Sequence, residues 1–248
     1  MNYKTSNLII VKEAVKKILK SASLGKKIYP FVQKAYKIYA TPMKRHRLRK
    51  HGAAALSRVI KVLRENDIEF YCDYGTLLGF IRDHGFISHD DDIDITIMPD
   101  TIQSKDLLNI LINAGFGFIH GFNYKGKLIE FTIADLSQVT IDFFFPVRNK
   151  KEKEIFETLV PDWSPMRKYP TEKANDVLLT PYIGAKEIQD YSVLGIDVKI
   201  PVNYEEVLTS EYGEWKIPDP KYDYREDKRI GRVDGFAFRL TKEEALSL

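Results

Sequence analysis

The chain concentrates negative charge beside a segment that has the composition of a buried strand. Residues 75–97 read GTLLGFIRDHGFISHDDDIDITI, with four aspartates within Asp90–Asp94 and β-branched side chains directly after them. Because side chains alternate between the two faces of a strand, Asp92 and Asp94 point to one face while the intervening isoleucine points to the core. Two carboxylates held close together in a half-buried place repel each other, so the pattern predicts a cation that neutralises them.

A third acid belongs to the same prediction. Asp142 lies between Ile141 and Phe143 in TIDFFFP, a second apolar strand that a proline ends. If this strand pairs with the one that contains Asp92 and Asp94, three carboxylates share one face of the sheet. Ligand sets made only of oxygen select hard ions, so we expect Mg²⁺ or Mn²⁺, which in turn holds phosphate groups.

Two other interpretations of the acidic run compete with a metal site. An acidic cluster is usually a solvated turn, but the β-branched residues after it and the second buried-looking acid argue against a turn. An EF-hand calcium loop shares the spacing of Asp90, Asp92 and Asp94. Ile95, however, occupies the position of the loop glycine, and Thr101 that of the bidentate glutamate, so an EF-hand is excluded.

Several residues near the acids are candidates for binding the phosphates of a substrate. Gly75 and Thr76 open a predicted helix whose backbone N–H groups and hydroxyl would hold a phosphate, although such a pair is more often only a helix cap. Arg82, near the end of that helix, either clamps phosphate or pairs with one of the aspartates. Lys125 is a second basic candidate for the same role.

The other candidates are expected around a substrate pocket. A histidine near acids is a base or a metal ligand, or, as most such histidines are, a hydrogen-bonded structural side chain. The two aromatic candidates shape a pocket for the acceptor or the alcohol, or serve only in packing. The full set is His89, Asp90, Asp91, Tyr212 and Trp215.

The order of the predicted elements indicates an α+β (mixed α/β) fold with a mixed sheet flanked by helices. We expect helices at 8–18, 28–39, 53–65, 75–82, 104–113 and 203–212, the last opened by a capping box of Asn203 and Glu206. We expect strands at 68–72, 93–98, 116–122, 128–134, 139–145 and 191–200. From Ile217 onward, the polar and proline-containing sequence predicts a poorly ordered tail that folds over the site.

The first fifty residues differ in charge from the rest of the chain. They hold fourteen Lys and Arg against one acid, Glu13, and their apolar residues follow helical spacing. Basic amphipathic helices of this kind bind anionic membrane surfaces, but they also pack on a core with their basic faces in water. Nucleic acid is not expected as a partner, because no nucleic-acid-binding module accompanies the charge. We therefore divide the chain into a basic helical region (1–50), a catalytic domain (51–218) and a tail (219–248).

Composition narrows the class of protein. A chain of 248 residues with 44% apolar content is long enough for one sizeable core. The single cysteine, Cys72, excludes an internal disulfide and a four-cysteine zinc site, and we expect it to be a small core residue. No apolar run of membrane-spanning length and no secretory signal are present. We expect a cytoplasmic protein, peripheral at the inner face of the cell membrane if the basic helices bind lipid.

At this point the sequence resembles a known family, the LicD / fukutin-related phosphotransferases. DYGTLLGFIRDHGFISHDDDIDITI is similar to the family signature of a G-[TS]-L-L-G helix, an arginine, a G-F-I turn and a D-D-D-I-D run. Ile141–Pro146 is similar to its hydrophobic-D-hydrophobic-F-P strand, and Tyr212–Pro218 to its closing Y-G-[DE]-W…P segment. The matches follow the family's order over roughly residues 66–218.

The resemblance implies a nucleotidyltransferase core like that of the DNA polymerase β superfamily. In this family the Gly75–Thr76 pair would contact the donor phosphates, and Asp92, Asp94 and Asp142 would bind the catalytic divalent ions. The implied activity moves a phospho-alcohol, such as phosphocholine, ribitol phosphate or glycerol phosphate, from a CDP-linked donor and releases CMP. The implied acceptor is a hydroxyl of a cell-surface glycan or its lipid-linked precursor, as in lipopolysaccharide, capsule or teichoic acid.

One departure from the family pattern and several alternatives stay open. Ser88–His89 replaces the proline–tryptophan that the family usually has beside the metal strand, which leaves the alcohol open. A nucleotidyltransferase, or an Asp-x-Asp glycosyltransferase that uses a nucleotide-sugar, would use similar acids and release pyrophosphate or a nucleoside diphosphate instead of CMP. A catalytically silent membrane or glycan adaptor would show no dependence on divalent metal.

Overall fold

The computed structural model describes residues 25–162, 174–219, 222–223 and 226–248. The chain forms two compact units, Met1–Lys44 and Arg45–Leu248. The helix predicted at 8–18 lies outside the described residues. All of the described strands belong to Arg45–Leu248, and the candidate site is built within this unit.

Helix α2 runs from Gly25 to Glu65 as one element, where the sequence predicted separate helices at 28–39 and 53–65. The residues between the two predicted helices lack apolar periodicity, but Lys and Arg are strong helix formers, so the helix continues through them. The apolar stripe predicted for its last turns is buried and consists of Leu56, Val59, Ile60 and Leu63. Within the described part of the chain, no helix combines the length and the hydropathy needed to cross a bilayer.

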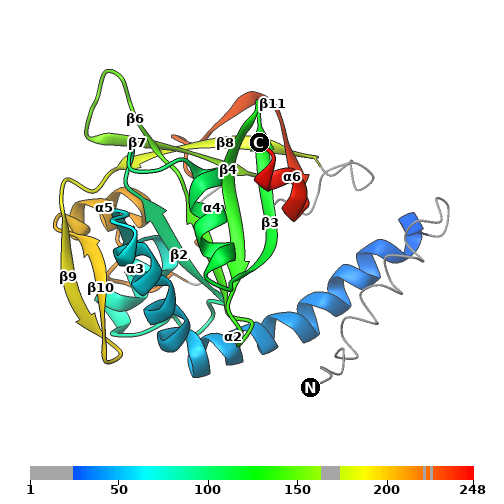
Figure 1. Ribbon diagram of the computed structural model, residues 1–248, viewed down its shortest axis with the longest axis horizontal. Coiled ribbons are helices and arrows are strands. Elements are labelled where there is room, and N and C mark those ends of the chain that lie inside the picture. Colours follow the sequence, from blue (N-terminus) through cyan, green and yellow to red (C-terminus); the bar gives the residue numbers. More distant parts are fainter. Residues whose placement is uncertain (1–24, 163–173, 220–221, 224–225) are drawn as a thin grey trace. The chain divides into compact units, whose positions relative to one another are not determined.

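A mixed sheet organises the described part of Arg45–Leu248 (Figure 1). Its strand order is β1-β2-β5-β4-β3-β11-β8-β7-β6. Strands β2 and β5 run parallel, and the other neighbouring pairs of this sheet are antiparallel. The predicted α+β fold is therefore confirmed. The strands are β1 (Phe70–Cys72), β2 (Asp92–Ile97), β3 (Gly117–Tyr124), β4 (Lys127–Ala134), β5 (Thr140–Phe144), β6 (Val147–Arg148), β7 (Ile155–Pro161), β8 (Ala174–Ile183) and β11 (Gly231–Leu240).

The main hydrophobic core lies on one face of this sheet. It joins the stripe of α2 to helix α4 (Ser104–Asn113) and to the alternate side chains of β2, β5 and β4. These strand residues are Ile93, Ile95, Phe131, Ile133, Ile141 and Phe143. Because alternate side chains face opposite ways, the aspartates between them point to the other face. Cys72 is buried in this core, as predicted.

The helix predicted at 75–82 is present in two parts. Helix α3 (Tyr74–Leu78) is followed directly by a one-turn π-helix, η1 (Gly79–Asp83). Single π turns of this kind are rare and occur frequently at functional sites.

The prediction of a single strand at 191–200 is wrong. Strands β9 (Ile188–Val193) and β10 (Ile196–Pro201) form a separate antiparallel hairpin. Leu194 and Gly195 make its turn with φ of 55° and 75°. Two residues with positive φ are typical of the tight turns that join hairpin strands, and the alternating pattern on both sides concealed this turn.

The prediction of a poorly ordered tail from Ile217 onward is also wrong, because this segment contains strand β11 and helix α6 (Lys242–Leu246). Strand β11 pairs with β3 on one side and β8 on the other, in the interior of the sheet. Most of its side chains are exposed, so its composition is polar. Its place depends on backbone hydrogen bonds to two neighbouring strands, which composition does not reveal. Strands β6, β7 and β8 were likewise not located from the sequence.

Helix α5 (Tyr204–Tyr212) confirms the helix predicted at 203–212, but not its capping box. The Asn203 side chain makes no cap hydrogen bond to its helix. Its Oδ1 accepts from the backbone N–H of Lys186 over 3.0 Å, and its Nδ2 donates to the carbonyl oxygen of Gly184 over 3.1 Å. Tertiary partners therefore use the amide that the sequence pattern assigned to the cap.

Candidate active site

The three acids of the predicted metal site lie side by side on one face of the sheet. Asp94 of β2 is directly opposite Asp142 of β5 in the parallel pair, and Asp92 precedes Asp94 by two residues on the same face. Ile93 and Ile141 point the other way and are fully buried. The strand pairing on which the prediction depended is confirmed. We call Asp92, Asp94 and Asp142 the acid row.

Burial and neighbouring acids act together on the acid row. The pKa of Asp94 is raised well above its usual value, first by burial and then by the charges of Asp92 and Asp142. The pKa of Asp90 is raised to about 6, mainly by burial. A bound cation would stabilise the ionised form of such carboxyl groups and lower their pKa.

A fourth carboxyl group, which the sequence analysis missed, lies on the same face. Glu130 of β4 is only 3% exposed and precedes Thr132, the residue opposite Asp142, by two positions. Burial, followed by the charges of Asp142 and Asp92, raises the pKa of Glu130 well above its usual value. A signal was present in the sequence, because KLIEFTIA places one acid in an apolar strand just as TIDFFFP does.

Gly75 and Thr76 are close to the acids for reasons other than the predicted phosphate contact. A Cβ at Gly75 would lie 2.8 Å from Oδ2 of Asp90 and 3.5 Å from Oδ2 of Asp94, so the glycine makes room for two carboxyl groups. Thr76 is 1% exposed, and its Oγ1 accepts the backbone N–H of Asp94 over 2.9 Å. Thr76 therefore fixes α3 to the strand that carries the acid row.

The chain enters α3 through a strained backbone. Tyr74 has φ of 45°, in the left-handed region that bulky residues rarely adopt. Its ring packs edge-on against Phe144 of β5, with ring centroids 4.8 Å apart. Phe144 follows Asp142 by two residues and shares its face. Strain of this kind persists where surrounding structure enforces it, and it clusters at functional sites.

A second group of buried carboxyls, Asp73 and Glu211, lies next to the acid row; we call it the acid pair. Thr96 donates from Oγ1 to Oδ2 of Asp73 over 2.6 Å, and Tyr182 donates to the same oxygen over 3.4 Å. Burial raises the pKa of Asp73 to about 6, although these hydrogen bonds oppose the shift. Burial, followed by the charge of Asp73, raises the pKa of Glu211 well above its usual value. Among the described residues, both carboxyl oxygens of Glu211 and Oδ1 of Asp73 have no hydrogen-bond partner.

The guanidinium of Arg82 is hydrogen-bonded within the protein. Its Nε and Nη2 donate to the Asp83 carboxylate over 2.8 and 3.0 Å, and its Nη1 donates to the carbonyl oxygen of Trp215 over 3.4 Å. Of its two predicted roles, pairing with an aspartate is the one observed, although Asp83 is outside the acid row. Trp215 is 7% exposed within the main core, and its Nε1 donates to Oγ1 of Thr209 over 3.2 Å, so its role is packing.

Lys125 lies apart from the acids. It occupies the turn between β3 and β4, with its Nζ 5.0 Å from the centroid of the Tyr124 ring. Strand β4 begins at Lys127, and Thr132, which is opposite Asp142, lies five residues farther along it. At about 3.3 Å per residue this places the turn roughly 17 Å from the acid row along the sheet. The structure thus does not bring Lys125 to the acids.

The loop that leads into β2 brings three other candidates to the edge of the acid row. His89 is exposed, whereas Asp90 and Asp91 are half-buried. The charge of His89 lowers the pKa of Asp90, and that of Asp91 raises it. These residues surround the acids, in agreement with their predicted place.

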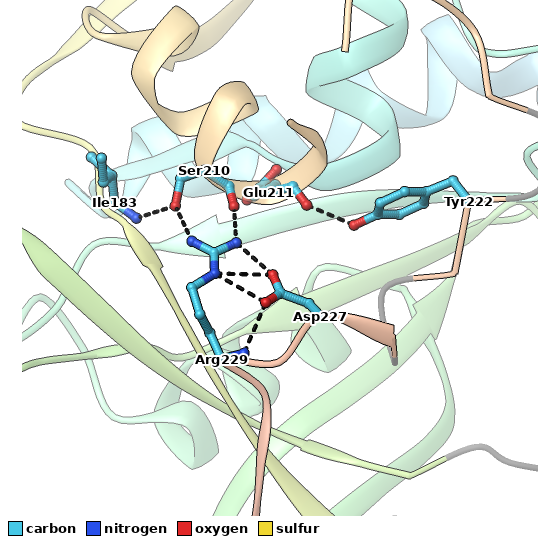
Figure 2. Close-up of polar contacts among 6 residues, drawn as sticks. All are labelled: Ile183, Ser210, Glu211, Tyr222, Asp227 and Arg229. Atoms are coloured by element: carbon cyan, nitrogen blue, oxygen red, sulfur yellow. Dashed lines mark hydrogen bonds and ion pairs between the residues drawn. The ribbon is translucent and has the colours of Figure 1, made fainter. Parts of the chain in front are cut away.

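A pocket with a volume of about 400 Å³ lies at the end of α5 and is lined by Glu211, Tyr212, Tyr222 and Arg229, among others. The two tyrosine rings have centroids 4.9 Å apart. Tyr222 donates to the backbone carbonyl of Glu211 over 2.6 Å, and Arg229 donates to Oγ of Ser210 over 3.2 Å (Figure 2). Tyr212 thus lines a pocket that the segment leading to β11 completes, and its predicted contact with a substrate stays a prediction.

The family follows from comparison with known proteins. Residues 67–186 match the sequence profile of the LicD/FKTN/FKRP nucleotidyltransferase domain, which covers the acid row and most of the strands around it. Residues 67–186 belong to the LicD/FKTN/FKRP family. The acid pair and the pocket extend beyond this domain, because Glu211 and Tyr212 follow its matched end.

Curated proteins similar to this chain come from bacteria and mammals. Uncharacterized protein RP689 of Rickettsia prowazekii is 28% identical over 179 residues, which cover 70% of this chain and 59% of the relative. Uncharacterized protein RT0683 of Rickettsia typhi is 34% identical over 87 residues, 33% of this chain and 28% of the relative. Ribitol-5-phosphate transferase FKTN of Mus musculus is 24% identical over 179 residues, 71% of this chain and 36% of the relative. The chain therefore matches less than two thirds of the length of each of these relatives.

The oxygen donors of the LicD-family domain fit a hard divalent cation. The acid row provides carboxylates on one rigid face, and Asp90 and Glu130 lie beside it. The repulsion that raises the pKa of Asp94 is what a cation would relieve. Among the described residues, no group of three or more His, Cys, Asp or Glu side chains is placed to hold a metal ion, so the metal site stays a prediction.

Proposed function

We propose that the chain is a metal-dependent phosphotransferase. It moves a phospho-alcohol from a CDP-linked donor to a hydroxyl of a glycan or its lipid-linked precursor, and it releases CMP. The observation that carries the proposal is the register that places Asp94 opposite Asp142 within a LicD/FKTN/FKRP domain. The relationship to a ribitol-5-phosphate transferase supports the reaction class, with ribitol phosphate, glycerol phosphate and phosphocholine as candidate groups.

The acid row would hold Mg²⁺ or Mn²⁺, which when bound neutralises the donor diphosphate and the charge on departing CMP. Asp142 accepts the proton of the acceptor hydroxyl as its oxygen attacks the phosphorus that bears the alcohol. A new P–O bond forms to the acceptor, and the bond between the two phosphates breaks in line with it. Asp90, at the edge of the row, helps to orient the donor.

We assign the alcohol group of the donor to the pocket at the end of α5. The paired rings of Tyr212 and Tyr222 provide flat apolar faces for the carbon skeleton of a polyol or for a quaternary ammonium group. Trp215 is not part of this assignment, because it belongs to the core.

We also propose that the basic region 1–50 holds the enzyme near a membrane-bound acceptor. Each Lys or Arg near an anionic bilayer contributes about 1 kcal/mol of binding free energy. Flotation with anionic vesicles at physiological salt tests this proposal. We expect the full chain to float and a chain lacking residues 1–50 to remain in solution; flotation of the shortened chain would contradict it.

Release of CMP is the decisive experiment. Purified protein with Mg²⁺ is incubated with CDP-choline, CDP-ribitol or CDP-glycerol and a mixture of glycan and lipid-linked acceptors. We expect CMP from one donor, its loss in Asp94→Asn, and its retention in Asp67→Asn, an exposed acid on a turn. Release of pyrophosphate or a nucleoside diphosphate instead would favour nucleotidyl or glycosyl transfer. A chain that binds neither divalent metal nor nucleotide would be an adaptor.

A further inference from the structure

Helix α2 lies antiparallel to the loop that leads into the acid strand. A Cβ at Gly52 would lie 2.6 Å from the ring of Phe86, so the helix and the loop are in close contact there. Three residues earlier on the helix, Arg49 donates from Nη1 to the carbonyl oxygen of Ser88 over 3.4 Å. Residues four apart share one face of a helix. The next residue on this face is therefore Arg45, where the loop reaches the acids.

Arg45 interacts with Asp90 by charge, and this interaction lowers the pKa of that carboxyl. The Arg45 side chain is half-buried, and the described residues offer no hydrogen-bond acceptor to its buried Nε. A guanidinium carries five N–H donors in a planar fork that fits the oxygens of a carboxylate or phosphate. A buried donor with no acceptor is uncommon, so the site indicates an anion that binds from outside the chain.

The comparison with Arg82 strengthens this interpretation. Both arginines act on Asp90, and they approach it from different helices. The guanidinium of Arg82, however, donates to Asp83 and to the backbone at Trp215. Arg82, the residue predicted to bind phosphate, is thus used to hold the protein together, and Arg45 is the arginine available to a substrate.

We propose that Arg45 binds a phosphate group of the substrate at the edge of the acid row. The inference rests on the proposed function, because that reaction brings phosphates to these acids. Two sources share the chemistry: the diphosphate of the donor, and the phosphate of a lipid-linked acceptor. In either case the planar fork of Arg45 donates to two phosphate oxygens, next to the charge of Asp90.

Direct binding to the full chain tests the role of Arg45. Calorimetry with Mg²⁺ measures the Kd of CDP, cytidine and farnesyl phosphate for the wild type, Arg45→Gln and the matched control Arg49→Gln. We expect Arg45→Gln to weaken CDP or farnesyl phosphate by about tenfold or more, as for loss of hydrogen bonds to a charged group. Cytidine should bind unchanged, and Arg49→Gln should match the wild type for all three probes.

The probe whose binding is weakened in Arg45→Gln identifies the phosphate source: CDP indicates the donor, and farnesyl phosphate indicates the acceptor. Arg45→Lys, which keeps the charge and loses the fork, should lie between the wild type and Arg45→Gln. It replaces Arg45→Gln if circular dichroism shows that the glutamine variant is unfolded. Equal weakening of cytidine would indicate a structural role and overturn the inference, as would unchanged binding of both phosphate probes.

The same experiment separates this inference from the proposed function. A wild-type chain that binds neither CDP nor cytidine would contradict the proposed function. Binding of farnesyl phosphate then tests the role of Arg45. The inference is overturned if Arg45→Gln binds farnesyl phosphate as tightly as the wild type does. It is also overturned if the wild type does not bind farnesyl phosphate. CMP release by the wild type together with unchanged phosphate binding in Arg45→Gln would retain the function and reject Arg45.

Discussion

The acid row and the acid pair lie next to each other, and they differ in the groups that act on their carboxyls. In the acid row, the charges that act on Asp94 come from other carboxyls. In the acid pair, Asp73 is buried and accepts hydrogen bonds from Thr96 and Tyr182, and its charge acts on half-buried Glu211. The backbone connects the two regions, because the N–H of Asp73 donates to the carbonyl oxygen of Asp94 over 3.2 Å.

The difference shows that burial of an acid does not by itself indicate a catalytic site. In the acid pair, Asp73 finds hydrogen-bond donors in Thr96 and Tyr182, which is the behaviour of a structural residue. The acid row faces like charges, which costs free energy until a cation or protons neutralise it. The groups that contact a carboxyl therefore distinguish a structural acid from a catalytic acid better than its pKa does, because the pKa is raised in both regions.

The same substitution in the two regions should have opposite effects, and the larger effect is expected in the acid row. Asp94→Asn should lower turnover by about a thousandfold or more, as for a residue of a catalytic unit. The free energy of unfolding without divalent metal should stay equal or rise, because one like charge is removed. CMP release and urea unfolding measure the two quantities. Turnover at the wild-type rate in a folded Asp94→Asn protein would break the comparison.

In the acid pair, Asp73→Asn should lower stability instead. Asparagine offers Thr96 and Tyr182 a neutral acceptor oxygen in place of a carboxylate, and it places a buried NH2 group where Oδ1 lay; the change costs about 1–3 kcal/mol of unfolding free energy. Turnover per folded molecule should fall far less than in Asp94→Asn. The midpoint of urea unfolding gives the stability change, and a variant as stable as the wild type but inactive would place Asp73 in the chemistry.

A smaller effect is expected from Gly75→Ala, which tests how closely the acids are held. The new Cβ would lie 2.8 Å from Oδ2 of Asp90, so that carboxyl must move. We expect turnover to fall by about tenfold through this displacement, with little change in stability. Gly117→Ala is the matched control, because its nearest atom would lie at an ordinary 3.8 Å. Equal activity of the two variants would show that the position of Asp90 is not critical.

The smallest effect is a pH dependence of stability in chelator. Folding raises the pKa of Asp94 and of neighbouring Asp90, so the folded chain binds more protons than the unfolded chain. Their contribution to stability is complete below the usual carboxyl pKa of 3.8 and is lost as pH rises through the raised value, which is about 6 for neighbouring Asp90. The melting temperature of the wild type minus that of Asp94→Asn should therefore fall between pH 4 and pH 7. Mg²⁺ should abolish the trend, and a constant difference in chelator would contradict it.

Much of the acid row was predictable from local pattern. The alternation of aspartate and isoleucine in β2 and the lone acid in β5 identify the face that Asp92, Asp94 and Asp142 share. Glu130 has the same signal but was overlooked. Asp73 and Glu211 are more than a hundred residues apart, and no spacing rule joins a residue before α3 to one at the end of α5.

The tertiary structure also determined which basic residues lie near the acids. Arg82 has the sequence position of a phosphate-binding residue, but Asp83 and the backbone at Trp215 hold its guanidinium. Arg45 lies outside every recognised motif and reaches the site because α2 packs along the loop. Lys125 remains far from the acids because of the length of β4.

The sequence by itself determined local features of this protein: strands β1 to β5, the face to which the acids of the acid row point, and the resemblance to a family. Periodicity and residue type act over a few neighbouring residues, so they can be read along the chain. Only the tertiary structure decided which acids lie near one another, which arginine is left for a substrate, and that the polar C-terminal segment completes the sheet. Those outcomes depend on contacts between distant residues, where burial and competition among partners determine which interaction forms.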